Sequence, residues 1–380
     1  MGTIRTLLAI AVVFAHSPWL EGFVLVGGPN AVLLFFMTSG FLMSFILVEG
    51  TSYKSTGTFY VSRWLRIYPL YFVVLCLTVA AYAMGKQEVF QIYTEIPASA
   101  VIALILSNLL LFGQDWLMFA GVQEGRLGFA TDQALTAGLF SPQAWTLSAE
   151  LMFYVIAPFI LRKRKLLIAL FAGSLLLRVI LALDGIGRVE PWSTRFLPST
   201  LCFFLAGALS HQLLFPVYKR YFGEHMQDAA KSATVVFLLI VLCYFLVPVP
   251  NIYLAPLLFP AFAFVLPLTF VFQGNNKWDE RIGELSYPIY IGHFLASRIA
   301  FLILHKAGVN DDFVHSITGV VAAIAFAIVL NLTIGRKVEA FRHHYKNKSK
   351  SRRRALRPYL QSPMIIGSQD NSPMRHRLRR

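Results

Sequence analysis

Apolar runs of about the length of a membrane-spanning helix recur along the whole chain. Such a helix needs on the order of 20 apolar residues, and short segments rich in charge, Pro and Gly separate one run from the next. Strand-like alternation is absent, which argues against a membrane barrel. The pattern predicts an all-α, polytopic membrane helix bundle of about 10 to 11 spans. The expected spans are 4–20, 31–48, 67–84, 98–112, 144–161, 166–183, 196–215, 233–247, 252–272, 285–304 and 316–334.

Composition supports a membrane protein. The 380 residues are 57% hydrophobic and 14% charged, and the mean hydropathy is +0.62. This is more apolar surface than one soluble core hides, so lipid is expected to cover the rest. The first run follows a single Arg and lacks a small-residue cleavage site, which favours a retained helix over a removable signal peptide.

Positive charge is concentrated at the end of the chain. Residues 336–380 hold 14 Lys or Arg against two acids, so about +12 of the net charge of +15 lies there. Basic segments stay on the cytoplasmic side, which predicts a transmembrane domain over 1–335 and a basic, disordered cytoplasmic tail over 336–380. Eleven full crossings would then place Arg63 and Arg66 outside. We therefore expect 67–84 or 98–112 to be re-entrant, with both termini cytoplasmic.

The basic tail favours anionic lipid as its partner. It follows a membrane span and carries few aromatic residues among its Arg and Lys, unlike a nucleic-acid-binding segment. A plain topology anchor is the alternative. The three cysteines, Cys76, Cys202 and Cys243, lie in apolar runs without metal-type spacing, so no metal site is predicted. Chemistry is therefore expected among ionisable residues within the spans.

Arg5 and His16 are the first such residues. Eleven helical positions separate them, which brings both side chains to nearly the same face but about 16 Å apart along the axis. They would serve different parts of one elongated ligand or one channel. The alternative is a histidine packed against a neighbouring helix.

Arg63 and Arg66 form the second cluster. Three residues apart, they share a helix face, and paired guanidinium groups suit the phosphates of lipids, nucleotides or coenzyme A. Ordinary anchoring at lipid headgroups is the alternative.

Two further polar groups interrupt apolar spans. Glu150 precedes Tyr154 by one turn, and a buried carboxylate suits a proton acceptor or a group that orients a histidine. Ser286, Tyr290 and His293 form a helical stripe that would line the same cavity as His16. Structural hydrogen bonding between helices accounts for either group equally well.

Together and in this order, the clusters match a known pattern. The matching pieces are Arg5 through His16, the Leu34 to Leu42 segment with Ser39, the Arg63/Arg66 segment, the Trp145 to Tyr154 segment, and Ser286-Tyr287 through His293. The chain resembles the bacterial membrane O-acyltransferases of acyltransferase family three.

The resemblance implies a function and a location. Members move an acyl group, commonly acetyl, from a cytoplasmic coenzyme A thioester to a hydroxyl of a glycan or similar acceptor. It implies acyl-CoA as co-substrate with no bound cofactor, and a multi-pass protein of the bacterial inner membrane. Exopolysaccharide, lipopolysaccharide, lipo-oligosaccharide and lipid-linked saccharide all remain possible acceptors, and succinyl remains an alternative to acetyl.

The resemblance also implies roles for individual residues. His16 would be the general base on the acceptor hydroxyl or a transient acyl carrier, and Glu150 would orient or deprotonate it. Arg5 would be the paired arginine, and Arg63 with Arg66 would hold the coenzyme A phosphates. The remaining substrate contacts would come from the matching segments, at Ser39, Trp145, Tyr154, Ser286, Tyr287 and His293.

The rival interpretation is a transporter or flippase for lipid-linked sugars. It would also show many spans with buried Arg, Glu and His, together with inverted repeats. The two halves of this chain show no repeat, which favours the enzyme. An inactive relative that only binds acyl-CoA is disfavoured by the presence of His16, Arg5 and both clamp arginines.

Overall fold

Every apolar run of the sequence contains a helix. The computed structural model describes residues 1–17, 19–20, 25–49, 55–85, 88–129 and 135–342. Within these ranges the chain is a helical bundle with one short hairpin, so the predicted all-α class is confirmed. The helices are α1 Gly2–Phe14, α2 Gly28–Val48, α3 Thr56–Gly85, α4 Glu88–Glu95, α5 Ala98–Leu110, α6 Trp145–Ile160, α7 Arg164–Asp184, α8 Leu197–Leu209, α9 Phe215–Phe222, α10 Met226–Cys243, α11 Asn251–Asn275, α12 Lys277–Glu284, α13 Ser286–Lys306 and α14 Asp312–Leu330.

Seven helical stretches among the described residues are long and apolar enough to cross a membrane. This is fewer than the 10 to 11 spans expected. Helices α1, α5 and α6 are shorter than a full crossing requires. Helices α8, α9 and α10 count as one stretch over Leu197–Leu246, but its 50 residues cover about 75 Å, enough for the two spans predicted there. The chain is a multi-pass membrane protein.

The two candidates for a re-entrant segment differ in length. Helix α3 is continuous over 30 residues, about 45 Å at 1.5 Å per residue, and so reaches across a bilayer. Helix α5 has 13 residues, about 20 Å, less than the hydrocarbon thickness of about 30 Å. The short helix is therefore the one whose length suits a re-entrant segment. After it comes the hairpin, β1 Ala120–Gln123 and β2 Arg126–Phe129, paired antiparallel.

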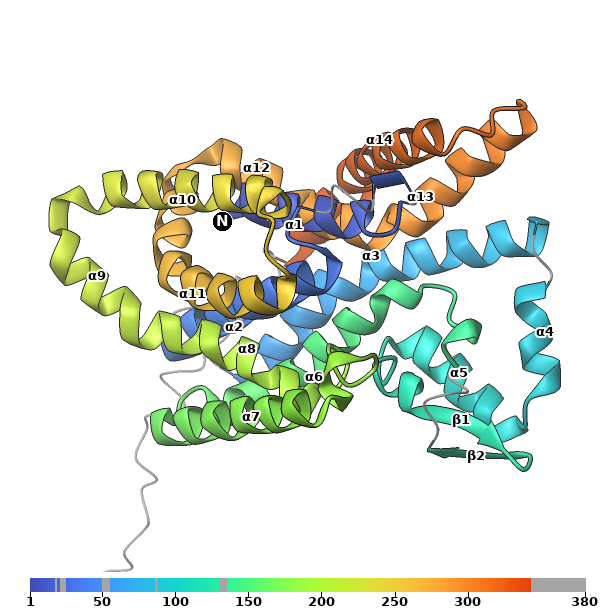
Figure 1. The fold of residues 1–380 in the computed structure, drawn as a ribbon, viewed down its shortest axis with the longest axis horizontal. Helices are drawn as coiled ribbons and strands as arrows, with labels where there is room; N and C mark the ends of the chain where they lie inside the picture. Colours follow the sequence, from blue (N-terminus) through green and yellow to red (C-terminus); the bar gives the residue numbers. More distant parts are fainter. Residues whose placement is uncertain (18, 21–24, 50–54, 86–87, 130–134, 343–380) are drawn as a thin grey trace, which may run out of the picture.

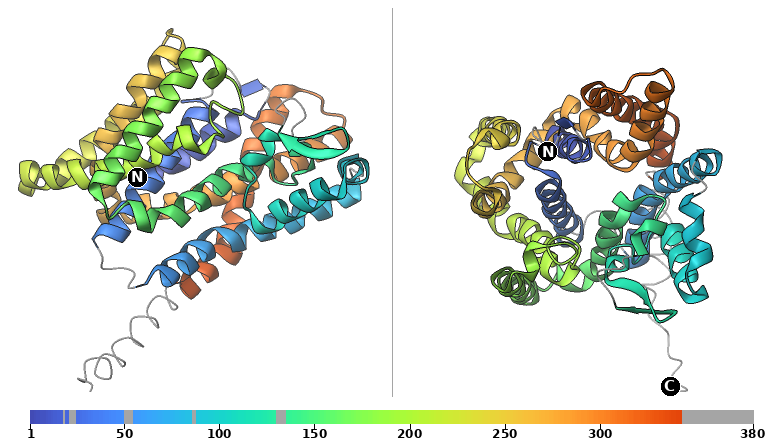
Figure 2. Two further views of the ribbon diagram at one scale, coloured as in Figure 1. Left: turned by 90° about the horizontal axis from the view of Figure 1, so that it is seen from below. Right: turned by 45° about the vertical axis from the view of Figure 1, so that its right-hand side comes forward.

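The helices surround α1 and α2. In Figure 1, α8 to α12 curve around the N-terminal helices on one side, while α13 and α14 lie on the other, and α4, α5 and the hairpin form a lobe at the end of α3. In the left view of Figure 2, most helices run in roughly the same direction. Helix α1 packs against α2, α12 and α13. The N-terminal helices are thus central to the bundle.

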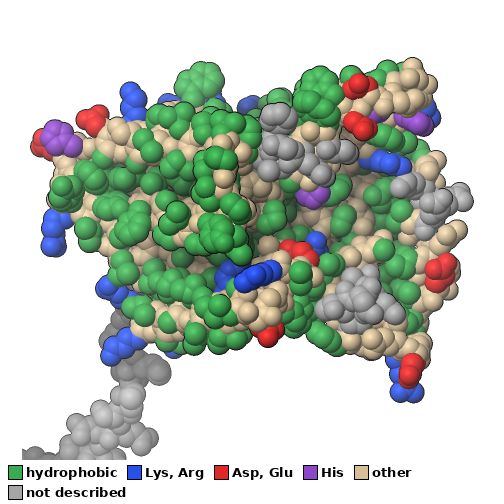
Figure 3. Space-filling view, viewed as in Figure 1, with side chains coloured by type: hydrophobic (Ala, Val, Ile, Leu, Met, Phe, Trp, Pro, Cys, Tyr) green, Lys and Arg blue, Asp and Glu red, His purple; other side chains and the backbone are tan. Residues whose placement is uncertain are grey.

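The outer surface is largely apolar. Hydrophobic side chains cover much of the face drawn in Figure 3, and charged side chains lie at its rim and in a small group near its centre. Leu176, Leu239 and Leu257 are each more than half exposed, at 60%, 55% and 69%. Large side chains left open to this extent suit contact with lipid rather than water.

Two glycines let α2 and α8 approach closely. A Cβ atom on Gly40 would lie 1.7 Å from the Phe204 carbonyl oxygen, and one on Gly207 would lie 1.8 Å from the Met37 carbonyl oxygen. Beside them, the rings of Phe36 and Phe204 stack at 4.3 Å. Only hydrogen fits at these positions, so the contact fixes the part of α2 that carries Ser39.

We expect Gly40→Ala to destabilise the bundle by about 1–3 kcal/mol, as overpacking of a tight interior does. The measurement is the thermal unfolding midpoint of the detergent-solubilised protein. Gly173→Ala is the matched control, because that helical glycine of α7 has open space where its Cβ would lie. A midpoint for Gly40→Ala equal to that of Gly173→Ala would contradict the close contact.

The start of α1 is capped by a residue from far along the chain. The Asp279 carboxylate of α12 accepts hydrogen bonds from the backbone N–H groups of Gly2 and Thr3, at 2.7 and 2.8 Å, and from the Thr3 hydroxyl at 2.6 Å. A carboxylate at a helix N-terminus satisfies unpaired N–H groups and complements the helix dipole. This cap fixes the first turn of α1 and, with it, Arg5.

Candidate functional site

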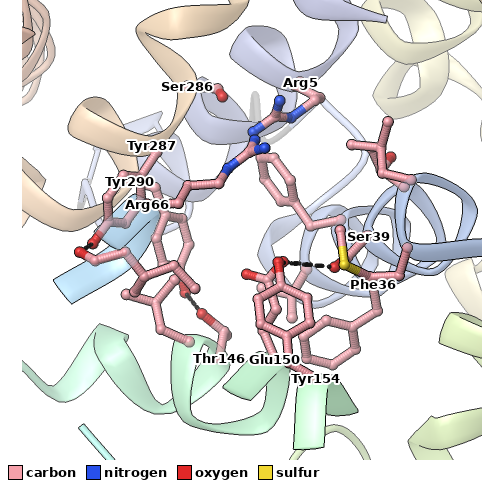
Figure 4. Close-up of a pocket in the computed structure, with 17 residues that line it drawn as sticks. Arg5, Phe36, Ser39, Arg66, Thr146, Glu150, Tyr154, Ser286, Tyr287 and Tyr290 are labelled. Atoms are coloured by element: carbon pink, nitrogen blue, oxygen red, sulfur yellow. Dashed lines mark hydrogen bonds between the residues drawn. The ribbon is translucent and has the colours of Figure 1, made fainter. Parts of the chain in front are cut away.

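One polar cavity lies among α1, α2, α3, α6 and α13. It encloses about 80 Å³, well below the roughly 300–1,000 Å³ of a pocket for a drug-sized ligand. Figure 4 shows its lining. The lining residues are Arg5, Val32, Phe35, Phe36, Thr38, Ser39, Leu42, Met43, Arg66, Ile67, Thr146, Leu147, Glu150, Tyr154, Ser286, Tyr287 and Tyr290.

Two guanidinium groups meet at one side of this cavity. Arg5 reaches in from the first turns of α1, and Arg66 from α3, and their side chains point toward one another (Figure 4). Both are half-buried, and each repels the other electrostatically. Neither makes a side-chain hydrogen bond to the described part of the chain. A converging pair of cations with unused N–H donors is a site for an anion such as a phosphate.

A carboxylate lies across the cavity from the arginines. One oxygen of Glu150 accepts hydrogen bonds from the Ser39 hydroxyl, at 2.6 Å, and from the Tyr154 hydroxyl. Ser39 comes from α2, whereas Glu150 and Tyr154 stand one turn apart on α6. Glu150 also acts electrostatically on Arg5 and Arg66. The fold thus brings five of the predicted site residues together around one cavity: Arg5, Ser39, Arg66, Glu150 and Tyr154.

A hydrogen-bonded layer that includes Thr146 and Tyr290 lines the cavity where the start of α6 meets α13. The Thr146 hydroxyl donates to the Tyr290 hydroxyl at 2.7 Å, and Tyr290 donates to the Gln143 carbonyl oxygen at 2.9 Å. The Gln143 amide in turn donates to the Ile291 carbonyl oxygen at 2.6 Å. All three side chains are buried. This closing layer, Thr146, Tyr290 and Gln143, joins the start of α6 to α13.

Two histidines lie beyond the closing layer. The rings of His16, just past the end of α1, and His293, on α13, have centroids 5.2 Å apart. Each places Nδ1 against a carbonyl oxygen, that of Val12 at 2.8 Å and that of Tyr290 at 2.7 Å. A carbonyl only accepts, so Nδ1 must carry the proton in both rings. In the neutral form of each ring, Nε2 therefore holds a lone pair, as a general base requires.

The two expected partners Glu150 and His16 are not in contact. The Val12 carbonyl orients the His16 ring, and the Glu150 carboxylate is held by Ser39 and Tyr154 in the cavity. The expectation that Glu150 orients His16 is therefore not met in this structure. The reason is that the two side chains lie on opposite sides of the closing layer, which helix periodicity within one span does not reveal.

The remaining predicted site residues fall into two groups. Ser286 and Tyr287 line the cavity, and the Tyr287 hydroxyl ties α13 to α3 by donating to the Ile67 carbonyl oxygen at 2.6 Å. Arg63 is 2% exposed and Trp145 is 8% exposed, and neither lines the cavity. Arg63 still acts electrostatically on Arg66 and on Tyr154. The clamp of two guanidinium groups that faces the cavity is thus Arg5 with Arg66.

A second polar group surrounds the start of α6. Asp115, in the loop after α5, is fully buried and accepts a hydrogen bond from the Ser148 hydroxyl at 2.8 Å. Arg195, in the segment before α8, places its guanidinium carbon 4.8 Å from the centre of the Trp145 ring. Burial raises the pKa of the Asp115 carboxyl to about 6, against the opposing effects of the Ser148 hydrogen bond and the Arg195 charge.

The raised pKa of Asp115 predicts a pH-dependent stability. Because the folded-state pKa, about 6, exceeds the unfolded value of 3.8, protonation favours the folded protein. This contribution is fully present below about pH 4 and is lost as the pH rises through about 6. The unfolding midpoint of wild type minus that of Asp115→Asn should therefore fall over this window, since the variant stays neutral. Parallel midpoint curves for the two proteins would contradict the assignment.

Sequence reasoning missed Thr146, Gln143 and Arg195. The first two lie in or beside a segment that was singled out, but nothing in its pattern shows that they pair with Tyr290. Arg195 does carry a signal. It is a lone basic residue in an aromatic stretch, Trp192 through Phe196, in a loop that the positive-inside rule assigns to the outer side. Among the described residues no group of three His, Cys, Asp or Glu side chains suits a metal ion.

Comparison with known proteins identifies the family. The family model of an acyltransferase domain, acyltransferase family 3, matches residues 2–336, which is most of the chain. No curated protein and no solved structure matches the chain. The match includes all five helices that line the cavity as well as both histidines, so the resemblance stated from the motifs is confirmed. The chain belongs to acyltransferase family 3.

Proposed function

We propose that this membrane acyltransferase is an O-acyltransferase that moves an acetyl group from acetyl-CoA to a hydroxyl of a cell-surface glycan or lipid-linked saccharide. The observation that carries the proposal is the separation of two kinds of chemistry along one path. Two arginines suited to phosphate face the cavity, and a histidine with a lone pair on Nε2 lies beyond the closing layer. The phosphates of the donor need the arginines, and the hydroxyl of the acceptor needs the histidine as a base.

The donor enters at the arginine side. Arg5 and Arg66 bind phosphate oxygens of coenzyme A, and Glu150 balances their charge across the cavity. The cavity, of about 80 Å³, is too small for the whole donor, so the closing layer has to open during turnover for the thioester to reach His16. The acceptor hydroxyl reaches His16, whose Nε2 removes the proton as the hydroxyl attacks the thioester. The transporter alternative is not favoured, because the acyltransferase domain covers nearly the entire membrane region.

We place the protein in the bacterial inner membrane with its C-terminus cytoplasmic. The basic tail carries the charge that favours this side and contacts anionic lipid. The tail beyond residue 342 lies outside the described residues. On this topology Arg5 and Arg66 face the compartment that holds acyl-CoA.

The test is mass spectrometry of cell-surface glycans from a strain that expresses the protein, beside the same strain without it. The expected result is an added mass of 42 Da per ester, about the mass of an acetyl group that replaces one hydrogen, which mild alkali removes. Isotope-labelled acetyl-CoA supplied to purified protein and the modified glycan's precursor should transfer the label. Absence of label in the glycan, with a protein shown to bind acetyl-CoA, would contradict the proposal.

A further inference from the structure

Arg195 holds a guanidinium group whose hydrogen-bonding capacity is largely unused. Its side chain is 20% exposed, and Nε is buried without a hydrogen-bond partner among the described residues. Arg195 forms an ion pair with Glu190, whose Oε2 lies 3.8 Å from Nε, beyond hydrogen-bond distance. The other Glu190 oxygen accepts from the Thr194 hydroxyl. The guanidinium is thus held in place by the Trp145 ring and by charge, and its two terminal NH2 groups have no hydrogen-bond partner among the described residues.

The second acid near Arg195 does not use these donors either. Asp115 acts electrostatically on Arg195, but its Oδ1 accepts from Ser148, and its Oδ2 has no partner in the described part of the chain. Removing a cation from water without satisfying its N–H groups costs free energy. A protein that keeps such a group beside its candidate site is therefore expected to use it on a bound species.

A short series of contacts connects Arg195 to the histidines. Trp145, under the guanidinium, is followed in the chain by Thr146, which donates to Tyr290. One turn along α13 from Tyr290 stands His293, whose ring lies beside that of His16. The charge of Arg195 also acts directly on His16. Arg195 therefore lies close enough to the candidate base for its charge to act on it, and it does not line the cavity that Arg5 and Arg66 face.

Acyl transfer needs a hydrogen-bond donor close to the reacting carbonyl oxygen. Attack on a thioester forms a tetrahedral intermediate with a negative oxygen, and donors aimed at that oxygen are commonly the largest single contribution to catalysis. The proposed function assigns a base and a donor-binding pair but no group that stabilises the oxyanion. We propose that Arg195 is a further catalytic residue, whose N–H groups bind the oxyanion formed during acyl transfer. This inference rests on the proposed function.

The step balances with the residues named. His16 Nε2 takes the proton of the acceptor hydroxyl, and the hydroxyl oxygen forms a bond to the thioester carbon. The carbonyl π electrons move to oxygen, where Arg195 donates hydrogen bonds to the negative charge. When the carbonyl re-forms, the C–S bond breaks, and the sulfur receives the proton from His16. The products are the ester and coenzyme A with a free thiol.

The test is steady-state kinetics of full-length protein in lipid nanodiscs, with acetyl-CoA and the acceptor glycan identified by ester analysis. We expect Arg195→Gln to lower kcat about 10²–10³-fold and to change the KM of either substrate less than threefold. Arg195→Lys keeps the charge but not the planar guanidinium group, so its kcat should lie between that of wild type and that of Arg195→Gln. Arg178→Gln is the matched control, because Arg178 also lies 4.8 Å from a ring centre, that of Phe203, but donates to the Ser193 carbonyl oxygen.

Each outcome is decisive. A raised KM for the acceptor at unchanged kcat would make Arg195 an acceptor-binding residue and overturn the proposal. So would equal losses in Arg195→Gln and Arg178→Gln, which would indicate a structural role. If Arg195→Gln fails to fold, Arg195→Lys with a wild-type unfolding midpoint must still lose kcat at least tenfold. Wild-type protein that transfers no acetyl group would remove the proposed function itself, whereas an unaffected Arg195→Gln would remove only this inference.

Discussion

His16→Ala is expected to lower the rate of acyl transfer about 10²–10⁴-fold, the usual contribution of a positioned general base. Membrane insertion and the unfolding midpoint should stay close to wild type. The reason is local. The hydrogen bond of the His16 side chain goes to Val12, four residues earlier in the same chain segment, so its loss breaks no hydrogen bond between helices.

The measurement is initial velocity of ester formation at saturating acetyl-CoA, with the amount of inserted protein matched between samples. His305→Ala serves as control, because that exposed histidine in the last turn of α13 bonds only to nearby Asn310 among the described residues. It should keep full activity. A His16→Ala protein with more than a tenth of wild-type velocity would show that His16 is not the base.

Arg66→Gln should raise the KM for acetyl-CoA about 10–100-fold, since hydrogen bonds to charged groups contribute about 1.5–3 kcal/mol and about 1.4 kcal/mol corresponds to tenfold in affinity. The chemical step uses groups beyond the closing layer, so kcat should change much less. Arg5→Gln should behave in the same way, because both guanidinium groups face one cavity. Donor titration by calorimetry, without acceptor, checks the affinity directly.

Arg63→Gln tests whether only the arginines that line the cavity bind the donor. Arg63 lies one turn from Arg66 on α3 but is buried outside the cavity lining. We expect its substitution to lower the unfolding midpoint and to leave the affinity of the folded fraction for acetyl-CoA within about threefold. A loss of donor affinity equal to that of Arg66→Gln would restore the pairing of Arg63 and Arg66 that their spacing first indicated.

Helices were predictable from this sequence because lipid imposes one strong rule, that a spanning segment be apolar over its length. The same rule misplaced the start of α3. The apolar run begins near Ile67, but the helix begins at Thr56, because the charged turns around Arg63 and Arg66 face the protein interior instead of lipid. Hydropathy indicates which residues contact lipid. A helix whose first turns carry polar residues that face other helices is therefore longer than its apolar run.

Contacts between helices could not be predicted from the sequence. Periodicity placed Ser286, Tyr290 and His293 on one stripe that was expected to line a cavity with His16. Ser286 and Tyr290 line the cavity, whereas His293 and His16 do not. Periodicity could not show that Glu150 pairs with Ser39 instead of approaching His16, since that depends on how deeply α2 and α6 sit relative to α1. The relative depth of these helices is set by features such as the close contact of Gly40 with the Phe204 carbonyl oxygen. The sequence alone does not show that these two residues meet.

The closing layer has a consequence for the energetics of the cell. A protein that joins a cytoplasmic donor to an external acceptor must contain a route through the bilayer, and any open aqueous route would let protons flow down their gradient. The buried Thr146 hydroxyl donates to that of Tyr290, which donates to the Gln143 carbonyl oxygen, so neither hydroxyl hydrogen is left to bind a water molecule at that level. A layer of this kind separates the polar groups on its two sides and so opposes proton flow between turnovers.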